Sequence, residues 1–543
     1  MDAITQVPRP VNEPVRSYAP GTPERASLRR TLDELAATPV DVAPVIGNRV
    51  RGGDAAHAVR MPSDHSTLLA RVRQSSAEDA TAAIDAAQAA SRDWSLMPFD
   101  ERAAIFLRAA ELLAGPWRDR LNASTMLGQG KTPQQAEIDA ACELIDFLRF
   151  NVAFARELHA NQPISSAGMW NRMDYRPLDG FVYAITPFNF TSIAGNLPTA
   201  PALMGNTVIW KPALTQSFSA HFWMELLLEA GLPEGVINML PGHGAEVSDV
   251  ALSHPALAGI HFTGSTRVFQ GLWAQVGANL AGYGAYPRLV GETGGKDFVV
   301  AHPSADPDAV VAALVRGAFE YSGQKCSAAS RTYLPRGLWN RIRDDLVART
   351  EALAVGDVRD FSNFTSSVID ERAFTKLSAA IDHARASADA EVIAGGTCDR
   401  SEGWYVRPTL VTTDNPRHDV LSTEYFGPLL GIFVYEDEKY DEVLRMVDET
   451  SSYALTGAVF ATERSAVELA SRELRHAAGN FYVNDKPTGA VVGQQPFGGS
   501  RASGTNDKAG SLWNLMRWVS PRSIKENLLP PTAIDYPHML PEA

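Results

Sequence analysis

Residues 181–192, FVYAITPFNFTS, begin as an apolar run with strand character that stops at a proline and continues into polar and aromatic residues. Similar short apolar runs follow at 207–210 (TVIW), 236–240 (VINML) and 260–262 (IHF), and helical segments such as 217–231 separate them. Strands that alternate with helices are typical of parallel sheets, because each parallel pair needs a crossover connection. We therefore expect a parallel α/β topology here.

A second series of strand-like runs begins at 297–303 (DFVVAHP) and 331–335 (RTYLP), and the alternation continues to about residue 485. A chain of 543 residues is too long for a single hydrophobic core, which favours two or three domains. The sequence therefore predicts two α/β domains with peripheral segments.

The N-terminal part has a different pattern. Residues 1–40 are rich in proline, arginine and polar residues and predict an extended arm with one short helix at 27–36. Amphipathic spacing predicts two helices between about 75 and 115 and a third at 136–158. Residues 166–179 mix aromatic and charged residues and indicate an excursion such as a hairpin.

Composition excludes several classes of protein. The formal charge of −14 and the absence of a basic run argue against nucleic acid or an anionic membrane as the main partner. No stretch of 18 apolar residues occurs, and the N-terminus lacks the apolar core of a signal peptide. Three cysteines without metal-ligand spacing predict neither a disulfide framework nor a metal site. We expect a soluble enzyme with a cytoplasmic location.

The stretch YSGQKCSAAS, residues 321–330, holds Cys326 among small, polar and cationic neighbours, whereas Cys142 lies in a helical stretch and Cys398 in a loop. A thiol attacks only as the thiolate, which the adjacent Lys325 or backbone N–H groups at a helix start would favour. Cys326 is therefore a candidate nucleophile. The alternative is a partly buried structural cysteine.

Other stretches could complete such a site. Glu292, in VGETGGKD at 290–297, could activate a water molecule, although it could also be an ordinary loop acid. Asn189, between two phenylalanines, could donate to a developing oxyanion or simply cap the next turn. The segments WKPA at 210–213 and FTGSTRV at 262–268 follow strands, and a glycine and hydroxyl groups leading into a helix can bind phosphate.

In their order and spacing, these motifs resemble the aldehyde dehydrogenase superfamily, over about residues 45–525. The matching motifs are PFNF, WKPA, FTGS, ETGGK, GQKC, EYFGP (424–428) and QQPFGGSRASG (494–504). The resemblance implies the α/β aldehyde dehydrogenase fold, with a Rossmann-like NAD-binding domain, an α/β catalytic domain and a small oligomerisation flap. The implied parts are an arm at 1–40, the NAD-binding domain at 41–165 and 180–290, the catalytic domain at 291–485, a substrate anchor loop at 486–504, and the flap and C-terminal tail at 166–179 and 505–543.

By this resemblance, Cys326 is the nucleophile that adds to an aldehyde to give a thiohemiacetal. The Asn189 side chain and the Cys326 backbone N–H would form the oxyanion hole. Hydride transfer to NAD would leave a thioester, and Glu292 would activate the water that hydrolyses it.

NAD is the implied cofactor. The implied contacts are Thr186 and Pro187 along the cofactor path, Lys211 at the adenosine ribose, Gly264 and Ser265 near the pyrophosphate, and Glu424 and Phe426 at the nicotinamide ribose and ring. Many family members carry an acidic residue where Leu214 stands here, which weakens a strict choice of NAD over NADP, although no Arg or Lys follows to favour a 2′-phosphate.

The substrate loop most closely resembles the 1-pyrroline-5-carboxylate dehydrogenases, the branch of the superfamily that oxidises L-glutamate γ-semialdehyde to glutamate in proline catabolism. Phe188 replaces the tryptophan common elsewhere in the superfamily. The resemblance implies that the α-carboxylate binds to Ser327 and to the backbone of Gly489 and Ala490, and that the aromatic rings of Phe190 and Phe497 sandwich the aliphatic chain. For the two phenylalanines, ordinary core packing is the alternative.

Three other functions stay open at this point. One is a dehydrogenase, dependent on NAD or NADP, for another short aldehyde such as succinate semialdehyde. A second is an NAD-binding scaffold without redox activity, and a third is a thioesterase-like hydrolase that uses Cys326. The resemblance further implies a homodimer or higher oligomer, with exposed Trp170 and Tyr175 at the interface, and a functional pairing with a separate proline dehydrogenase. Neither nucleic acid nor a membrane is an expected partner.

Overall fold

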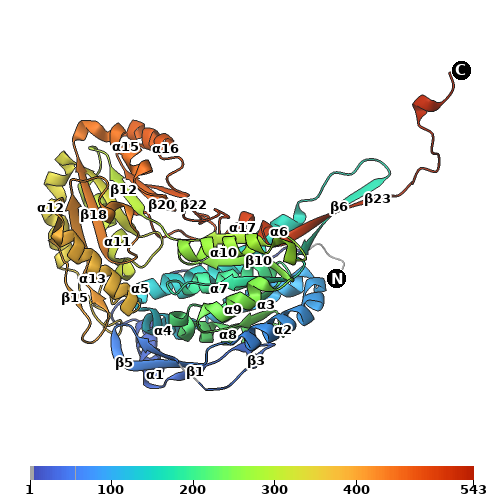
Figure 1. Ribbon diagram of the computed structural model, residues 1–543, viewed down its shortest axis with the longest axis horizontal. Coiled ribbons are helices and arrows are strands. Elements are labelled where there is room, and N and C mark those ends of the chain that lie inside the picture. The colour runs from blue at the N-terminus through green and yellow to red at the C-terminus, as the bar shows by residue number, and fades with distance from the viewer. Residues whose placement is uncertain (1–4, 55–56, 543) are drawn as a thin grey trace.

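Two seven-stranded sheets organise the computed structural model, which describes residues 5–54 and 57–542 (Figure 1). The first sheet has the order β11-β10-β7-β8-β9-β2-β3. Its strands are β2 (Val45–Ile46), β3 (Arg49–Val50), β7 (Phe181–Ile185), β8 (Thr207–Lys211), β9 (Ile237–Met239), β10 (Leu257–Thr263) and β11 (Arg288–Glu292). The strands predicted from 181 to 262 are therefore confirmed, with small shifts at their ends.

The strand order of the first sheet reverses beside β7, which pairs in parallel with β8 on one side and with β10 on the other. Because the chain leaves β7 and β10 in opposite directions, a crevice opens at the carboxyl ends of these strands, where ligands of doubly wound sheets bind. The main helices between these strands are α7 (Thr191–Leu203), α8 (Ser217–Glu229), α9 (Gly244–Ser253) and α10 (Thr266–Ala278). Nearly all residues of β7 and β8 are buried, as expected for a sheet covered on both faces.

The second sheet has the order β14-β17-β18-β13-β12-β20-β21 and is parallel except for its edge strand β14. Its strands are β12 (Asp297–Ala301), β13 (Ala329–Pro335), β14 (Ala390–Ala394), β17 (Thr409–Thr413), β18 (Leu429–Tyr435), β20 (Thr456–Phe460) and β21 (Asn480–Val483). Helices α11 (Pro307–Phe319), α12 (Arg336–Glu351), α13 (Glu371–Ala386), α15 (Tyr440–Glu449) and α16 (Arg464–Glu473) accompany it. This confirms the predicted second α/β series.

The N-terminal helices agree with the sequence except in one place. The structure has α1 (Pro23–Ala37), α2 (Ala77–Leu96), α3 (Phe99–Ala114), α4 (Arg118–Gln129), α5 (Pro133–Ala136) and α6 (Leu144–Ala160). Ser76 and Asp79 form the capping box at the start of α2. The single helix predicted at 136–158 is instead interrupted by a π-helical turn, Glu137–Glu143. Such turns are rare and often occur at functional sites.

The remaining strands are short or peripheral. β1 (Val40–Val42), β4 (His57–Met61) and β5 (Asp64–Val72) form a three-stranded sheet, and β15 (Cys398–Asp399) pairs with β16 (Tyr405–Val406) and β19 (Tyr453–Ala454) with β22 (Ser500–Arg501). The short helices α14 (Asp419–Ser422) and α17 (Leu512–Met516) complete the chain.

A two-stranded ribbon projects from the body on the right of Figure 1. It pairs β6 (Met169–Pro177) with β23 (Val519–Asn527) in antiparallel register. The excursion predicted at 166–179 is present, but it is not a local hairpin, because the partner strand comes from the other end of the chain. Trp170 is 53% exposed, whereas Tyr175 is half-buried and donates to the carbonyl of Asn161, so the expectation that both are exposed holds only for Trp170.

Within residues 5–54 and 57–542, no helix combines the length and the apolar character needed to cross a membrane.

Candidate active site

The two sheets meet where β11 ends at Glu292 and the chain continues through residues 293–296 directly into β12. Cys326 lies beside this junction, between a short 3₁₀ turn, Glu320–Gly323, and the start of β13. A cavity of about 940 Å³ opens here and has both Cys326 and Glu292 in its wall. Its size and its mixture of apolar and polar groups suit a small ligand.

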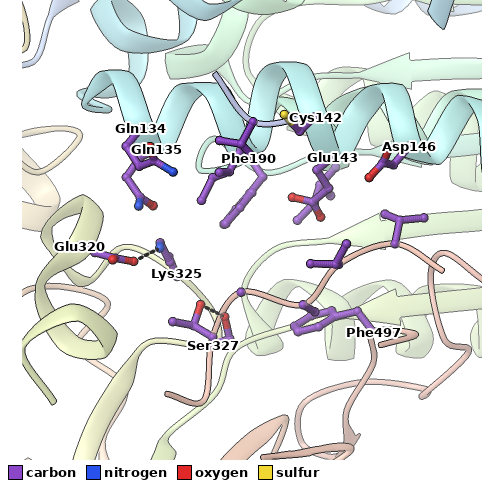
Figure 2. Close-up of a pocket in the computed structure, with 18 of the residues that line it drawn as sticks. Gln134, Gln135, Cys142, Glu143, Asp146, Phe190, Glu320, Lys325, Ser327 and Phe497 are labelled. Atoms are coloured by element: carbon purple, nitrogen blue, oxygen red, sulfur yellow. Dashed lines mark hydrogen bonds and ion pairs between the residues drawn. The ribbon is translucent and has the colours of Figure 1, made fainter. Parts of the chain in front are cut away.

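Seven of the residues predicted for the site line this one cavity, although they come from widely separated segments. They are Cys326, Glu292, Phe190, Ser327, Gly489, Ala490 and Phe497. Figure 2 shows Phe190 and Glu143 pointing into the cavity from one side, and Ser327 and Phe497 from the other. Asn189 does not line the cavity.

The surroundings of Cys326 favour the neutral form of its thiol. Burial raises the pKa of its thiol above the usual range, and the nearby carboxylates, Asp297 before Glu292, raise it further. The expectation that Lys325 favours the thiolate is wrong, because the Lys325 ammonium pairs with Glu320 at 3.1 Å. Nor does Cys326 lie at the start of a helix.

Glu292 is positioned by the segment that follows Phe497. Its Oε2 accepts a hydrogen bond from the Gly499 N–H at 3.1 Å. Burial nevertheless raises the pKa of this carboxyl well above its ordinary value. A carboxylate with a raised pKa is a stronger base once ionised, which suits a group that must take a proton from water.

Asn189 is 3% exposed and lies against the loop that carries Cys326. Its Nδ2 donates to the carbonyl oxygen of Gln324 at 3.1 Å. Gln324 in turn accepts from the Ile369 N–H at 2.8 Å through its own side chain. The amide is thus fixed near the thiol loop.

Hydrogen-bond donors gather at one end of the cavity. The hydroxyls of Ser327 and Thr488 lie 2.8 Å apart. The N–H groups of Gly489 and Ala490 donate to no protein acceptor within the described residues. The ammonium of Lys486 also lies here, since a Cβ on Gly489 would stand 3.2 Å from its Nζ. This end can therefore accept an anion such as a carboxylate.

A buried ion pair fixes Phe190. The Lys131 ammonium lies 2.7 Å from Asp139 and 3.9 Å from the centre of the Phe190 ring. Asp139 also accepts the N–H groups of Thr191 and Ser192, at 3.0 and 2.8 Å, at the start of α7. The π-helical turn thereby anchors the segment that presents Phe190.

The sequence reasoning missed several groups of this cavity, notably Glu143, Thr488 and Lys486. Burial and, after it, the charge of Asp139 raise the pKa of the Glu143 carboxyl to about 8. The sequence did contain one indication of Glu143. Three acidic residues fall within 137–143, in a predicted helix whose other residues are mostly apolar. Thr488 and Lys486 gave none beyond their place in the predicted loop.

The residues predicted for the cofactor lie outside this cavity, and most of them occupy the carboxyl edge of the first sheet. Thr186 follows β7, and its hydroxyl accepts from the Trp210 indole at 3.0 Å; Pro187 comes next in the chain. Lys211 ends β8, and Gly264 and Ser265 follow β10. Glu424 accepts the Gly295 N–H at 2.9 Å, and Phe426 packs edge-on against Phe188 with ring centres 5.8 Å apart.

This edge fits a dinucleotide. Ser265 is the N-cap of α10 but makes no side-chain capping bond, so the first N–H groups of the helix are available to an anionic group. Burial lowers the pKa of Lys211 to about 8, and its ammonium forms no ion pair within the described residues. Its ammonium lies close to Gly244, where a Cβ would stand 3.5 Å from Nζ, so the glycine leaves the space beside the ammonium free of a side chain.

The aldehyde dehydrogenase family model matches residues 50–524. The mitochondrial delta-1-pyrroline-5-carboxylate dehydrogenase of Dictyostelium discoideum is 51% identical over 542 residues, covering 99% of this chain and 97% of the relative. The crystal structure of the delta-pyrroline-5-carboxylate dehydrogenase from Mycobacterium tuberculosis bound with NAD is 60% identical with a TM-score of 0.97, covering 99% of this chain and all of that one. Proline utilization A from Bdellovibrio bacteriovorus is 30% identical with a TM-score of 0.91; the match covers 96% of this chain but 54% of that chain. The predicted fold is confirmed.

The expectation of a cytoplasmic location is contradicted by the relatives' names. Those from Dictyostelium discoideum, Mus musculus and Homo sapiens are named mitochondrial. The reasoning failed because few cysteines and no apolar span are equally compatible with any reducing, aqueous compartment.

Proposed function

The chain belongs to the aldehyde dehydrogenase family, and we propose from this that it is an NAD-dependent dehydrogenase that oxidises L-glutamate γ-semialdehyde, the hydrolysed form of 1-pyrroline-5-carboxylate, to L-glutamate in proline catabolism. NAD is the cofactor, as in the Mycobacterium tuberculosis relative. The substrate assignment rests on one observation. A single cavity contains Cys326 and an anion-binding end that is formed by Ser327, Thr488, Gly489 and Ala490.

Cys326 is the proposed nucleophile. The thiol first gives its proton to solvent water, because only the thiolate attacks, and the thiolate sulfur then forms a bond to the aldehyde carbon as the carbonyl π bond breaks and its electron pair moves to the oxygen. The resulting oxyanion is stabilised by the Asn189 amide and the Cys326 N–H. When bound, NAD supplies the hydride acceptor and a positive charge that favours the ionised forms of the thiol and of Glu292. Loss of hydride from the carbon leaves a thioester on Cys326.

Glu292 is the proposed base of the second half-reaction. Its carboxylate accepts a proton from water as the water oxygen attacks the thioester carbon, and the C–S bond breaks to release glutamate and the Cys326 thiolate. The hydrogen bond from the Gly499 N–H keeps the carboxylate oriented while it does so.

Both charges of an amino acid are carried by its α-carbon, and opposite walls of the cavity offer a partner to each of them. The α-carboxylate binds the Ser327 and Thr488 hydroxyls and the N–H groups of Gly489 and Ala490, near the Lys486 ammonium. The α-ammonium faces Glu143, and ionisation of that carboxyl is favoured by the cation. Phe190 and Phe497 enclose the methylene chain between them. Thr186, Pro187, Lys211, Gly264, Ser265, Glu424 and Phe426 are the proposed cofactor contacts.

The direct test is NADH formation with fresh 1-pyrroline-5-carboxylate, with succinate semialdehyde and propanal in parallel. A strong preference for 1-pyrroline-5-carboxylate supports the proposal. Comparable weak rates with all three aldehydes would agree with membership of the family but would overturn the assignment of this substrate. Succinate semialdehyde lacks the α-ammonium that Glu143 would bind, so it separates the proposal from the nearest alternative.

Replacing Gly489 with valine should reduce kcat/KM for the semialdehyde by roughly 100-fold. Gly489 has φ +101°, where a side chain is strained, and any shift of its N–H removes a carboxylate donor. Steady-state kinetics measure the effect. Gly271→Val is the matched control, since nothing lies within 4 Å of a Cβ at that position. Equal losses with propanal and the semialdehyde would contradict the anchoring role.

The Kd for NAD should rise several-fold between pH 7 and pH 9. The Lys211 pKa is lowered to about 8, so its ammonium is charged below that pH and loses its proton as the pH rises through it. The loss removes a charged donor to the cofactor. Protein fluorescence titration measures the Kd; Lys211→Met should abolish this pH dependence, and exposed Lys439→Met should retain it. A Kd that does not change with pH in the unaltered protein would exclude this contact.

The division into parts is also a proposal: arm 1–40, NAD-binding domain 41–165 and 180–290, catalytic domain 291–485, anchor loop 486–504, and flap with tail 166–179 and 505–543. The projecting β6–β23 ribbon supports the flap as the contact between copies in a homodimer or higher oligomer. Pairing with a separate proline dehydrogenase is supported by the match to about half of a proline utilization A chain.

A further inference from the structure

The N-terminal arm, residues 5–20, takes no part in the chemistry above, yet it forms part of the cavity wall. It runs along the π-helical turn and α6, the segment that carries Glu143. The arm residues in the wall include Asn12, Glu13, Val15, Ser17 and Tyr18.

Buried carboxylates fix the register of the arm. The Glu13 N–H donates to Asp146 at 2.8 Å, and the Arg16 N–H donates to Glu137 at 2.8 Å. Arg118, with a side chain 2% exposed, pairs with both Glu13 and Glu137. Breaking such buried pairs is costly, so the arm is a fixed part of the fold.

Asn12 is the arm residue that reaches across to the anchor loop. Its Nδ2 donates to Asp146 Oδ2 and to the carbonyl oxygen of Val492, both at 2.8 Å. Its Oδ1 accepts from the Gln494 side chain at 2.9 Å. One amide thereby links the helix behind Glu143 to the loop that presents the carboxylate donors.

Within residues 488–495, the anchor loop makes few other contacts with the rest of the chain. Thr488 bonds to Ser327 at its start, and Gly493 packs so closely on Phe150 that a Cβ would stand 2.2 Å from the ring. Between them, Gly489 and Ala490 donate to no protein acceptor within the described residues. The position of Val492 therefore sets where these two N–H groups point.

We propose that Asn12 is a positioning residue for substrate: it holds the anchor loop, through the Val492 carbonyl and Gln494, at the distance from Glu143 that fits an α-amino acid. This inference rests on the proposed function, and it acts on substrate binding rather than on the covalent steps.

Asn12→Ala should raise the KM for the semialdehyde by roughly ten-fold and the inhibition constant of L-glutamate by the same factor. The values of kcat, the Kd for NAD and the Tm should change little, because Cys326, Glu292 and the buried arm contacts remain. Gln6→Ala, an exposed amide on the same arm, is the matched control and should leave all five quantities unchanged.

Asn12→Asp gives a sharper test because it keeps the shape and replaces the donor by an acceptor. Its carboxylate would face Asp146 and the Val492 carbonyl, so the KM should rise beyond that of Asn12→Ala. Adding Asp146→Asn supplies a donor toward residue 12 and should bring the KM back toward the Asn12→Ala value.

The outcomes separate the two proposals. No NADH from 1-pyrroline-5-carboxylate with the unaltered protein would overturn the proposed function. Activity in the unaltered protein with an unchanged KM in Asn12→Ala would overturn the positioning role alone. A parallel fall of kcat, NAD affinity and Tm would also overturn it, because that pattern indicates general destabilisation.

Discussion

Cys326→Ala should lower turnover by more than about 10⁴-fold, because no other group can form the thiohemiacetal and thioester. Cys142 and Cys398 cannot substitute for it. Cys142 lies in the cavity wall beside the arm, but its thiol is directed at the arm, with the sulfur 3.8 Å from the Pro14 carbonyl oxygen, and Cys398 lies in the peripheral strand β15. NADH absorbance gives the rate, and calorimetry should give an unchanged Kd for NAD.

Cys398→Ala is the matched control, since the same atom is removed from a half-buried strand position away from the cavity. It should retain full activity. Turnover of Cys326→Ala within ten-fold of the unaltered enzyme would contradict the nucleophile assignment. Loss of NAD binding as well would instead indicate a disturbed fold.

Glu292→Gln should separate the two half-reactions. Acylation still delivers one equivalent of NADH per active site, but hydrolysis slows by about 10²- to 10⁴-fold because no base takes the proton from water. Rapid mixing should therefore show a burst of NADH followed by a slow steady state. Intact mass measurement should find the acyl group on the protein and peptide mapping should place it at Cys326.

Glu143→Gln provides the contrast, because it makes the same change in the same cavity. It should raise the KM for the semialdehyde without producing a burst, since Glu143 faces the ammonium end. A burst in both variants, or in neither, would assign the hydrolytic base to another group.

The Glu292 carboxyl has a pKa raised well above its ordinary value, so steady-state hydrolysis should slow as the pH falls below that pKa and the carboxyl is protonated.

Much of the fold could be predicted locally. The apolar runs that became β7, β8, β9 and β10 are strands because their residues are buried on both sheet faces, and the alternation with helices requires parallel pairing. The β6 strand could not be predicted in this way. Its partner β23 lies about 350 residues away, and pairing between the two ends of the chain leaves no local pattern.

The π-helical turn Glu137–Glu143 could not be predicted from the sequence pattern either. Periodicity indicated a continuous helix, but Asp139 binds Lys131 and the start of α7, and Glu137 binds the arm. These are contacts with distant segments, and they explain why acidic residues occupy an otherwise buried helix. The pKa of Cys326 also could not be predicted from neighbouring residues. The adjacent Lys325 suggested a thiolate, but Lys325 pairs with Glu320, and burial raises the pKa of the thiol.

The sequence by itself determined the α/β class and the family, because ordered motifs and strand periodicity are carried by neighbouring residues. It also predicted Cys326, Glu292, Phe190, Ser327 and Phe497 as site residues, and the structure brings these five residues together in one cavity. The tertiary structure alone decided that Glu143 lies in the cavity wall opposite Ser327 and Phe497, that Asn12 ties the arm to the anchor loop, and that burial raises the pKa of the Cys326 thiol. Each of these features depends on burial and on contacts between segments that are distant in the chain. Burial and such contacts exist only in the folded protein.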